Sequence, residues 1–213
     1  IRCANAVIAQ TRYQKDKVLE NYGVHAVLIK NSYILSNKNV TKSEKPSVLW
    51  VATMKVWKQP EIFIELAKKF PNVNFTMIGG PSKDQDYYKS IISKSEYIDN
   101  LNFVGFIPHY EIERYFRAAW IFVNTSQKEG FPNTFLQSWA NHTPVVSLNV
   151  DPDEIICEHR LGFHSRTFNQ MVEDVRTLLG NSELRKEMGL NGMKYVEKEH
   201  DIQVNIEKLM ELL

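Results

Sequence analysis

Two lysines stand at a place in the sequence where a bound anion would explain them. Lys55 and Lys58 come just ahead of Pro60, and a proline is a typical first residue of a helix. Cations at the amino end of a helix dipole are unfavourable unless an anion lies beside them. We therefore predict an anion-binding loop over 53–59. The alternative is that both side chains extend into water, which costs little.

A second candidate is the turn Glu129-Gly130-Phe131-Pro132-Asn133-Thr134, which precedes an expected helix over 134–141. Its glycine lets the chain turn and leaves the backbone N–H groups of Phe131, Asn133 and Thr134 near the amino end of that helix. Such N–H groups form a ready anion site. The alternative is a plain connecting turn with its glutamate in water.

From residue 46 the chain alternates short apolar runs with segments of helical period. Strands are expected over 48–52, 73–78, 101–104, 120–123 and 144–148. Helices are expected over 60–70, 84–97, 110–118 and 134–141, with a short one from Asp153. This alternation predicts a doubly wound α/β fold with a parallel sheet. The loops after the first and fourth strands, 53–59 and 124–133, should then flank the point where the winding reverses, where ligands bind.

The first 45 residues form a separate small block. Apolar runs at 6–9 and 26–29 flank a polar helix over 13–22, and a linker-like stretch over 31–46 ends in a proline. We predict a domain boundary near residue 45, with one domain over 46–213. A helical tail follows residue 182, and we expect the first block to supply part of the apolar surface that its last amphipathic segment needs.

Composition excludes several classes of protein. With 26 basic and 25 acidic residues there is no overall field to attract nucleic acid or a membrane surface. The two cysteines, Cys3 and Cys157, and the six scattered histidines match no metal spacing, and so few cysteines fit a reducing, cytoplasmic compartment. The loop over 52–58 lacks the glycines of a dinucleotide-binding turn, and no Walker sequence occurs, which argues against hydride transfer and nucleotide hydrolysis. The first residue is not Met, and we expect the chain to begin inside a longer protein.

Four segments in order carry a family resemblance. Residues 129–137 are similar to a motif that has two glutamates eight positions apart. Thr143-Pro144-Val145-Val146 follows this motif at the expected distance. Residues 50–58 look like a Gly-Arg loop with a lysine five positions on, and residues 103–107 look like a segment that contacts a nucleotide base. The chain resembles the Rossmann-like carboxyl-terminal domain of family 4 retaining glycosyltransferases with the GT-B fold. By the same resemblance, residues 1–45 are a remnant of the amino-terminal domain plus the hinge.

The resemblance implies a function for these segments. The chain would bind a UDP- or GDP-sugar as its substrate, without a cofactor or metal, and pass the hexose to a glycan or lipid-linked acceptor held by the missing domain. Lys58 would neutralise the diphosphate and Glu129 would contact the hexose, as the catalytic residues. The other expected donor-binding residues are Thr53, Lys55, Val104, Phe106, Gly130, Phe131, Asn133, Thr134 and Gln137. Alone, the chain would bind donor without efficient transfer. Peripheral contact with the inner membrane face through the missing domain stays open.

The sequence departs from the family pattern at two positions. Ala52-Thr53 replaces Gly-Arg, so Lys55 would have to substitute for a guanidinium. Gln137 replaces the second glutamate; its amide oxygen can still accept a hydrogen bond from ribose, but Thr134-x-x-Gln137 also reads as a capping box at a helix start. These departures favour an alternative function, a noncatalytic nucleotide-sugar sensor.

One acidic sequence also has two interpretations. Asp151-Pro152-Asp153 has the spacing of the metal-holding pair of a different glycosyltransferase fold. With Asp151 as N-cap and Pro152 as first helical residue it also forms a helix start, which we favour.

Overall fold

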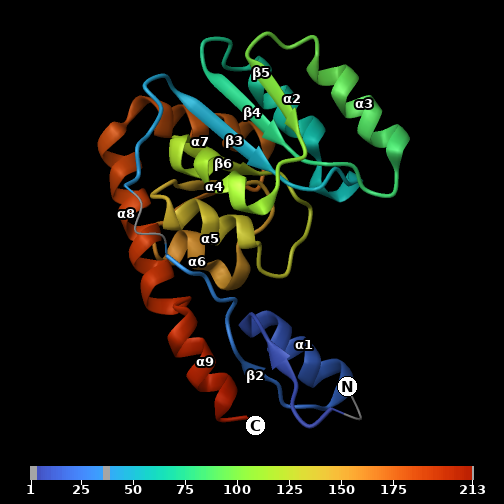
Figure 1. The fold of residues 1–213 in the computed structure, drawn as a ribbon, viewed down its shortest axis with the longest axis vertical. Coiled ribbons are helices and arrows are strands. Elements are labelled where there is room, and N and C mark those ends of the chain that lie inside the picture. The colour runs from blue at the N-terminus through green and yellow to red at the C-terminus, as the bar shows by residue number, and fades with distance from the viewer. Residues whose placement is uncertain (1–3, 36–38, 213) are drawn as a thin grey trace.

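A computed structural model describes residues 4–35 and 39–212 of the chain (Figure 1). Cys3 and residues 36–38 of the expected linker lie outside this range. The main body is built on a six-stranded parallel sheet in the order β5-β4-β3-β6-β7-β8. Its strands are β3 (Ser47–Val51), β4 (Asn74–Ile78), β5 (Leu101–Gly105), β6 (Ile121–Asn124), β7 (Val145–Ser147) and β8 (Gly162–His164). The winding starts at the central strand β3, runs outward to β5, and restarts at β6 in the other direction. This confirms the doubly wound fold.

Helices cover both faces of the sheet and bury two apolar clusters. The described helices of this body are α2 (Pro60–Lys68), α3 (Gln85–Ser95), α4 (His109–Ala118), α5 (Asn133–Ala140), α6 (Ile155–Glu158), α7 (Phe168–Gly180) and α8 (Ser182–Glu199). Side chains of α2, α3 and α7 pack around Trp50 in one cluster. Side chains of α4, α5 and α6 pack around Phe122 in the other. The inner strands β6 and β7 are buried on both faces, as their continuous apolar runs require.

The predicted strands and helices lie within a few residues of the observed ones, but one strand and one helix were not predicted. The strand β8 has only three residues, Gly162-Phe163-His164, too few to show a period. The helix α7 begins at Phe168, where Thr167 accepts a hydrogen bond from the N–H of Gln170.

The first block folds as predicted into β1 (Ile8–Ala9), α1 (Arg12–Tyr22) and β2 (Val27–Leu28), with the two strands parallel. Figure 1 shows α9 (Ile202–Met210) descending beside it. Their link is polar, since Asn205 Nδ2 donates to Ser32 Oγ at 3.2 Å. The prediction that the first block covers the apolar face of α9 is wrong. Apolar side chains of α9 stay exposed, namely Val204, Ile206, Leu209 and Met210. The domain boundary near residue 45 stays a prediction.

The close contact between α5 and α8 depends on a glycine, so a larger residue at that position should destabilise the fold. A Cβ at Gly189 would overlap the carbonyl oxygen of His142, which follows α5. We expect Gly189→Ala to lower the free energy of unfolding by ~1–3 kcal/mol, because this overpacking outweighs alanine's helix propensity. Urea unfolding followed by tryptophan fluorescence measures it. Gly180→Ala is the matched control, since a Cβ there meets nothing within 4 Å. Equal stabilities of the two variants would contradict the expectation.

Candidate functional site

The loops after β3 and β6 meet at the winding reversal, as predicted. The N–H of Gln127 donates to the carbonyl oxygen of Trp57 at 2.8 Å. Thr125 Oγ1 donates to the carbonyl oxygen of Lys58 at 2.6 Å, and the buried Trp50 Nε1 donates to the same hydroxyl at 2.9 Å. Hydrogen bonds from a core tryptophan through to the Lys58 backbone therefore fix the position of that lysine.

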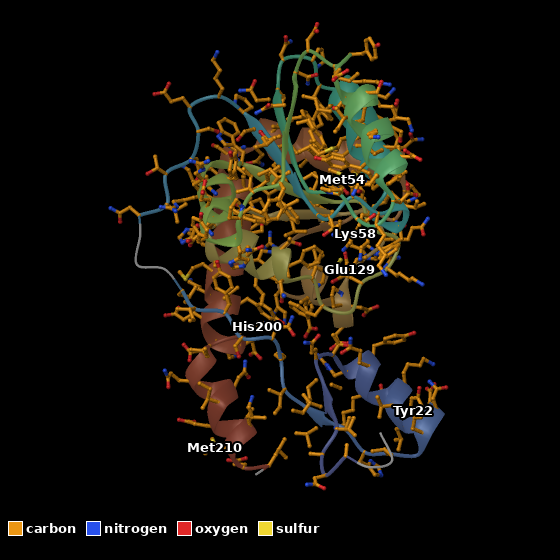
Figure 2. The ribbon with its side chains drawn as sticks, turned by 45° about the vertical axis from the view of Figure 1, so that its right-hand side comes forward. Tyr22, Met54, Lys58, Glu129, His200 and Met210 are labelled. Atoms are coloured by element: carbon orange, nitrogen blue, oxygen red, sulfur yellow. The ribbon has the colours of Figure 1, made fainter. Side chains whose placement is uncertain are left out.

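Lys58 and Glu129, the two predicted catalytic residues, form an ion pair between these loops (Figure 2). Lys58 ends a short 3₁₀ turn, Val56–Lys58, and its side chain is 19% exposed; that of Glu129 is 17% exposed. Ser126 Oγ donates to the same Glu129 oxygen at 2.8 Å. Because both charges are largely buried, the pair is screened less than a surface pair. An anion that enters this site competes with Glu129 for Lys58.

The start of α5 faces the site without a side-chain cap among the described residues. Pro132 takes the N-cap position, and a proline side chain offers no acceptor. The capping-box interpretation of Thr134 and Gln137 is therefore wrong: Thr134 is the second residue of the helix. The helix begins one residue earlier than predicted, at Asn133. Pro132 thus gives no side-chain cap to the first N–H groups of α5, and the anion site at this turn stays a prediction.

Residues that follow β2 and α8 also contact this turn. Asn31 Nδ2 donates to Asn133 Oδ1 at 2.7 Å, and Phe131 packs against the ring of His200 with centroids 5.0 Å apart. Gly130 lies against α1, because a Cβ there would come 2.6 Å from Gln14 Nε2. The turn is thus bordered by Asn31, by His200 and by α1.

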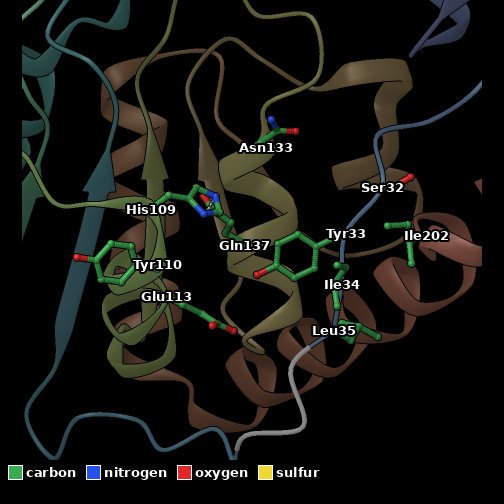
Figure 3. A pocket seen from close by; sticks show the side chains of 10 residues that line it. All are labelled: Ser32, Tyr33, Ile34, Leu35, His109, Tyr110, Glu113, Asn133, Gln137 and Ile202. Carbon is green, nitrogen blue, oxygen red and sulfur yellow. Dashed lines mark hydrogen bonds between the residues drawn. The ribbon is translucent and has the colours of Figure 1, made fainter.

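Gln137 points to a different partner from the one its local sequence suggests. Its side chain is buried, with the residue 7% exposed, and Nε2 lies 3.3 Å from His109 Nε2 (Figure 3). Both line a pocket of about 480 Å³, together with Tyr33, Tyr110 and Glu113 among others. Sequence reasoning missed His109, and its only signal was its place directly after the 103–107 segment.

The remaining predicted donor-binding residues lie at the carboxyl ends of β3 and β5. Lys55 Nζ lies 4.7 Å from the ring centroid of Trp57. Thr53 is exposed, Val104 is half-buried, and Phe106 is 71% exposed. The structure therefore brings Lys58 to Glu129 and leaves Lys55 on an aromatic ring.

The match to a protein family covers the ion pair and the sheet that carries it. A family model described as "Glycosyl transferases group 1" matches residues 33–195. The chain belongs to this family. The matched range includes all six strands of the main sheet and both loops that hold the ion pair.

Curated relatives of this group 1 chain are considerably longer. Glycosyltransferase 1 domain-containing protein 1 of Xenopus tropicalis is 26% identical over 141 residues, which cover 66% of this chain and 41% of the relative. Trehalose synthase of Pyrococcus horikoshii is 27% identical over 183 residues, which cover 80% and 44%. The chain thus spans less than half the length of these relatives.

Solved structures share the fold of the group 1 chain. The TarM G117R mutant of S. aureus, in complex with fondaparinux, alpha-GlcNAc-glycerol and UDP, matches with a TM-score of 0.85 at 22% identity, covering 99% of this chain and 44% of that one. Anabaena HepE in complex with UDP and glucose matches with a TM-score of 0.81 at 16% identity, covering 99% and 63%. Both support the GT-B fold that the sequence resembles.

A second pocket of the group 1 chain, about 410 Å³, lies between Glu129 and the start of α1. Asp153 caps α1 here, accepting from the N–H of Arg12 at 2.7 Å and of Tyr13 at 3.1 Å. Asp151 takes the N-cap position of a 3₁₀ turn, Pro152–Glu154, with Pro152 as its first residue, as favoured from the sequence. Its side chain accepts from the N–H of Ile156 at 2.8 Å, in α6, which follows directly from Ile155. Each carboxylate therefore serves a helix start.

The described ranges, 4–35 and 39–212, contain neither a metal-binding cluster nor a helix that could span a membrane. No group of three His, Cys, Asp or Glu side chains there is arranged to hold a metal ion. None of the helices there has the length and apolar character that crossing a bilayer requires.

Proposed function

We propose that this chain binds the nucleotide-sugar donor of a glycosyltransferase. The observation that carries the proposal is the Lys58–Glu129 pair, which lies at the winding reversal opposite the uncapped start of α5. A cation and free helix N–H groups suit a diphosphate, and a carboxylate beside them suits sugar hydroxyls. The structures of TarM and HepE support this proposal, since both contain UDP.

The ion pair gives the proposed mechanism. The diphosphate lies between Lys58 and the first N–H groups of α5, and Lys58 exchanges Glu129 for a phosphate oxygen. Glu129 then accepts hydrogen bonds from the hexose. Negative charge grows on the diphosphate as the glycosidic bond breaks. Hydrogen-bond donors that are fixed in advance therefore stabilise the transition state more than the ground state. The lysine and the positive end of the helix dipole neutralise this negative charge without a metal or cofactor.

The transfer step needs an acceptor for the sugar. We propose that the hexose passes with retention to a glycan or lipid-linked acceptor, bound by a part of the protein beyond this chain. The family resemblance supports this division, because it places the acceptor site in the amino-terminal domain. The contact of the Glu129–Gly130 turn with α1 is consistent with it, since the first block borders the pocket beside Glu129.

A noncatalytic nucleotide-sugar sensor is the second candidate. It is favoured by Thr53, which offers no charge where the family pattern has arginine, and by Gln137 in place of a glutamate. Incubating the full-length protein with labelled nucleotide sugars and a lipid or glycan extract separates the two. Product formation supports the enzyme, and binding without turnover over all donors supports the sensor.

Donor binding itself is tested by a thermal-unfolding screen against UDP, GDP, ADP and their sugars. A ligand at 100 times its Kd adds about 2.7 kcal/mol, which raises the Tm of a chain of this size by roughly 5–10 °C. We expect such a rise for one nucleoside diphosphate and its sugars. If none of these ligands shifts the Tm at millimolar concentration, the chain is not a donor-binding domain.

A further inference from the structure

Glu129 is held by two side chains that behave differently when a nucleotide sugar binds. In the described part of the chain, Lys58 Nζ and Ser126 Oγ both donate to Oε1 of this carboxylate, Ser126 at 2.8 Å. In the proposed mechanism Lys58 leaves Glu129 for the diphosphate. Ser126 is then the side-chain donor that stays on the carboxylate. Without it, the long side chain of a glutamate would regain its rotamer freedom and lose it again on meeting the hexose.

Ser126 is fixed at the end of strand β6 through its main chain. The residue is 2% exposed, and Asn124, the last residue of β6, is 6% exposed. Asn124 Oδ1 accepts from the backbone N–H of Ser126 at 3.1 Å, the contact that an asparagine commonly makes two residues on. The Ser126 carbonyl oxygen accepts from Asn149 Nδ2 at 3.3 Å. Two asparagines, one from β6 and one from the segment after β7, therefore hold this serine.

Asn124 also sets the direction of the Ser126 hydroxyl. A backbone N–H only donates, so the atom of the Asn124 amide that faces it is the oxygen. The amide nitrogen then lies 3.4 Å from Ser126 Oγ and donates to it. Because a serine hydroxyl carries one proton and Oγ accepts from Asn124, that proton is left for Glu129. The hydrogen bonds thus run in one direction, from Asn124 through Ser126 to the carboxylate.

We propose that Ser126, oriented by Asn124, is a positioning residue that keeps Glu129 in place after Lys58 has moved to the diphosphate. The inference rests on the proposed donor-binding function and deepens it. Lys58 and Ser126 together hold the carboxylate before the nucleotide sugar binds, and Ser126 holds it afterwards. Glu129 then meets the hexose hydroxyls in a position that is already fixed.

The test compares the affinities for UDP and UDP-glucose by calorimetry. UDP with UDP-galactose or UDP-N-acetylglucosamine, or GDP with GDP-mannose, replaces this pair if the thermal screen selects it. Ser126→Ala should weaken binding of the sugar nucleotide about 3- to 10-fold, the usual effect of one hydrogen bond. The affinity for UDP should change less than about twofold, because the Ser126 bond is present before and after UDP binds. Asn124→Ala should give the same pattern, with a loss of at least about twofold for the sugar nucleotide.

A double variant separates positioning from a general effect on the fold. Glu129→Ala removes the group on which Ser126 acts, so adding Ser126→Ala to it should cause no further loss of affinity for the sugar nucleotide. Ser95→Ala is the matched control, because Ser95 is 3% exposed and its hydroxyl donates to the carbonyl oxygen of Ile92 at 2.7 Å in α3. It should bind both ligands as the wild type does.

Several outcomes would overturn the inference. Equal losses for UDP and UDP-glucose in Ser126→Ala would show a structural role, as would a further loss in the double variant. Wild-type binding of UDP-glucose by Ser126→Ala or by Asn124→Ala would also contradict it. If the wild-type protein binds UDP but no sugar nucleotide, there is no hexose contact to position, and the inference fails while the diphosphate site stands. If it binds no nucleotide at all, the proposed function fails first.

Discussion

Replacing Lys58 by alanine should weaken the binding of a nucleoside diphosphate roughly 10- to 100-fold, the usual cost of removing a hydrogen bond to a charged group. In a protein that completes the transfer reaction, kcat should fall about 100- to 1,000-fold, as when one preorganised donor is removed from an oxyanion site. The reason is geometric. Lys58 is held by Thr125 and Trp50 beside the start of α5, so no other lysine can take its place without moving the loop.

Calorimetry with UDP and with uridine measures this effect and locates it. The loss of affinity in Lys58→Ala should be large for UDP and small for uridine, because Lys58 contacts the diphosphate. Lys69→Ala, which removes an exposed lysine at the end of α2, should bind both ligands as the wild type does. Lys55→Ala should have an intermediate effect, since its ammonium group lies over Trp57. An unchanged UDP affinity in Lys58→Ala would refute the diphosphate clamp.

The partner residue supplies a change of opposite sign. Glu129→Gln removes a carboxylate that competes with the diphosphate for Lys58, so UDP without a sugar should bind more tightly. The same substitution should slow transfer, because a charged contact to the hexose is lost. A structural role for the ion pair predicts instead that Glu129→Gln weakens UDP binding as Lys58→Ala does. The two variants together therefore separate a ligand-binding pair from a structural one.

The sequence was sufficient to predict the fold and the place of the site, and the reason is topological. Alternating strands and helices impose a parallel sheet, and the loops 53–59 and 124–133 then meet at the winding reversal whatever their side chains. That Lys58 and Glu129 bind each other was not predicted. They are 71 positions apart, and their pairing depends on how Thr125 and Gln127 join the two loops.

Local patterns misled where tertiary contacts decide. The spacing of Thr134 and Gln137 suits a capping box, but Pro132 occupies the N-cap and Gln137 turns to His109 on the neighbouring helix α4. Helical period alone suggested that α9 needed a covering surface from the first block, whereas the two meet through Asn205 and Ser32. In both cases the pattern was local and the deciding contact lay far away in the chain.

Acid should destabilise the chain through His200, which joins the two segments that cross between the first block and the sheet. Its Nδ1 donates to the carbonyl oxygen of Asn31 at 2.6 Å, and its own carbonyl oxygen accepts from the N–H of Tyr33 at 2.9 Å. The imidazole has no exposed surface and lies between Phe131 and Tyr195. Burial is the main cause that lowers the pKa of His200 to about 4.

The consequence for stability follows from the direction of this pKa change. The unfolded chain binds a proton at His200 near pH 6.5, and the folded chain binds it only near pH 4. The contribution of His200 to the free energy of unfolding is complete above about pH 6.5. It is lost as the pH falls toward about 4, a change of about 3 kcal/mol. Burial also lowers the pKa of His142, but His142 is present in every variant and cancels in the difference.

Two substitutions of His200 test this assignment by urea unfolding between pH 7.5 and pH 4, conditions that bracket the expected change. His200→Asn keeps a donor toward Asn31, and His200→Phe keeps a ring between Phe131 and Tyr195, but neither titrates. Both variants should lose about 3 kcal/mol less than the wild type over this range, even if they differ from each other by a constant amount. The constant difference reports the hydrogen bond and the packing, and the slope reports the buried proton site. Profiles parallel to that of the wild type would show that another group causes the acid sensitivity of the chain.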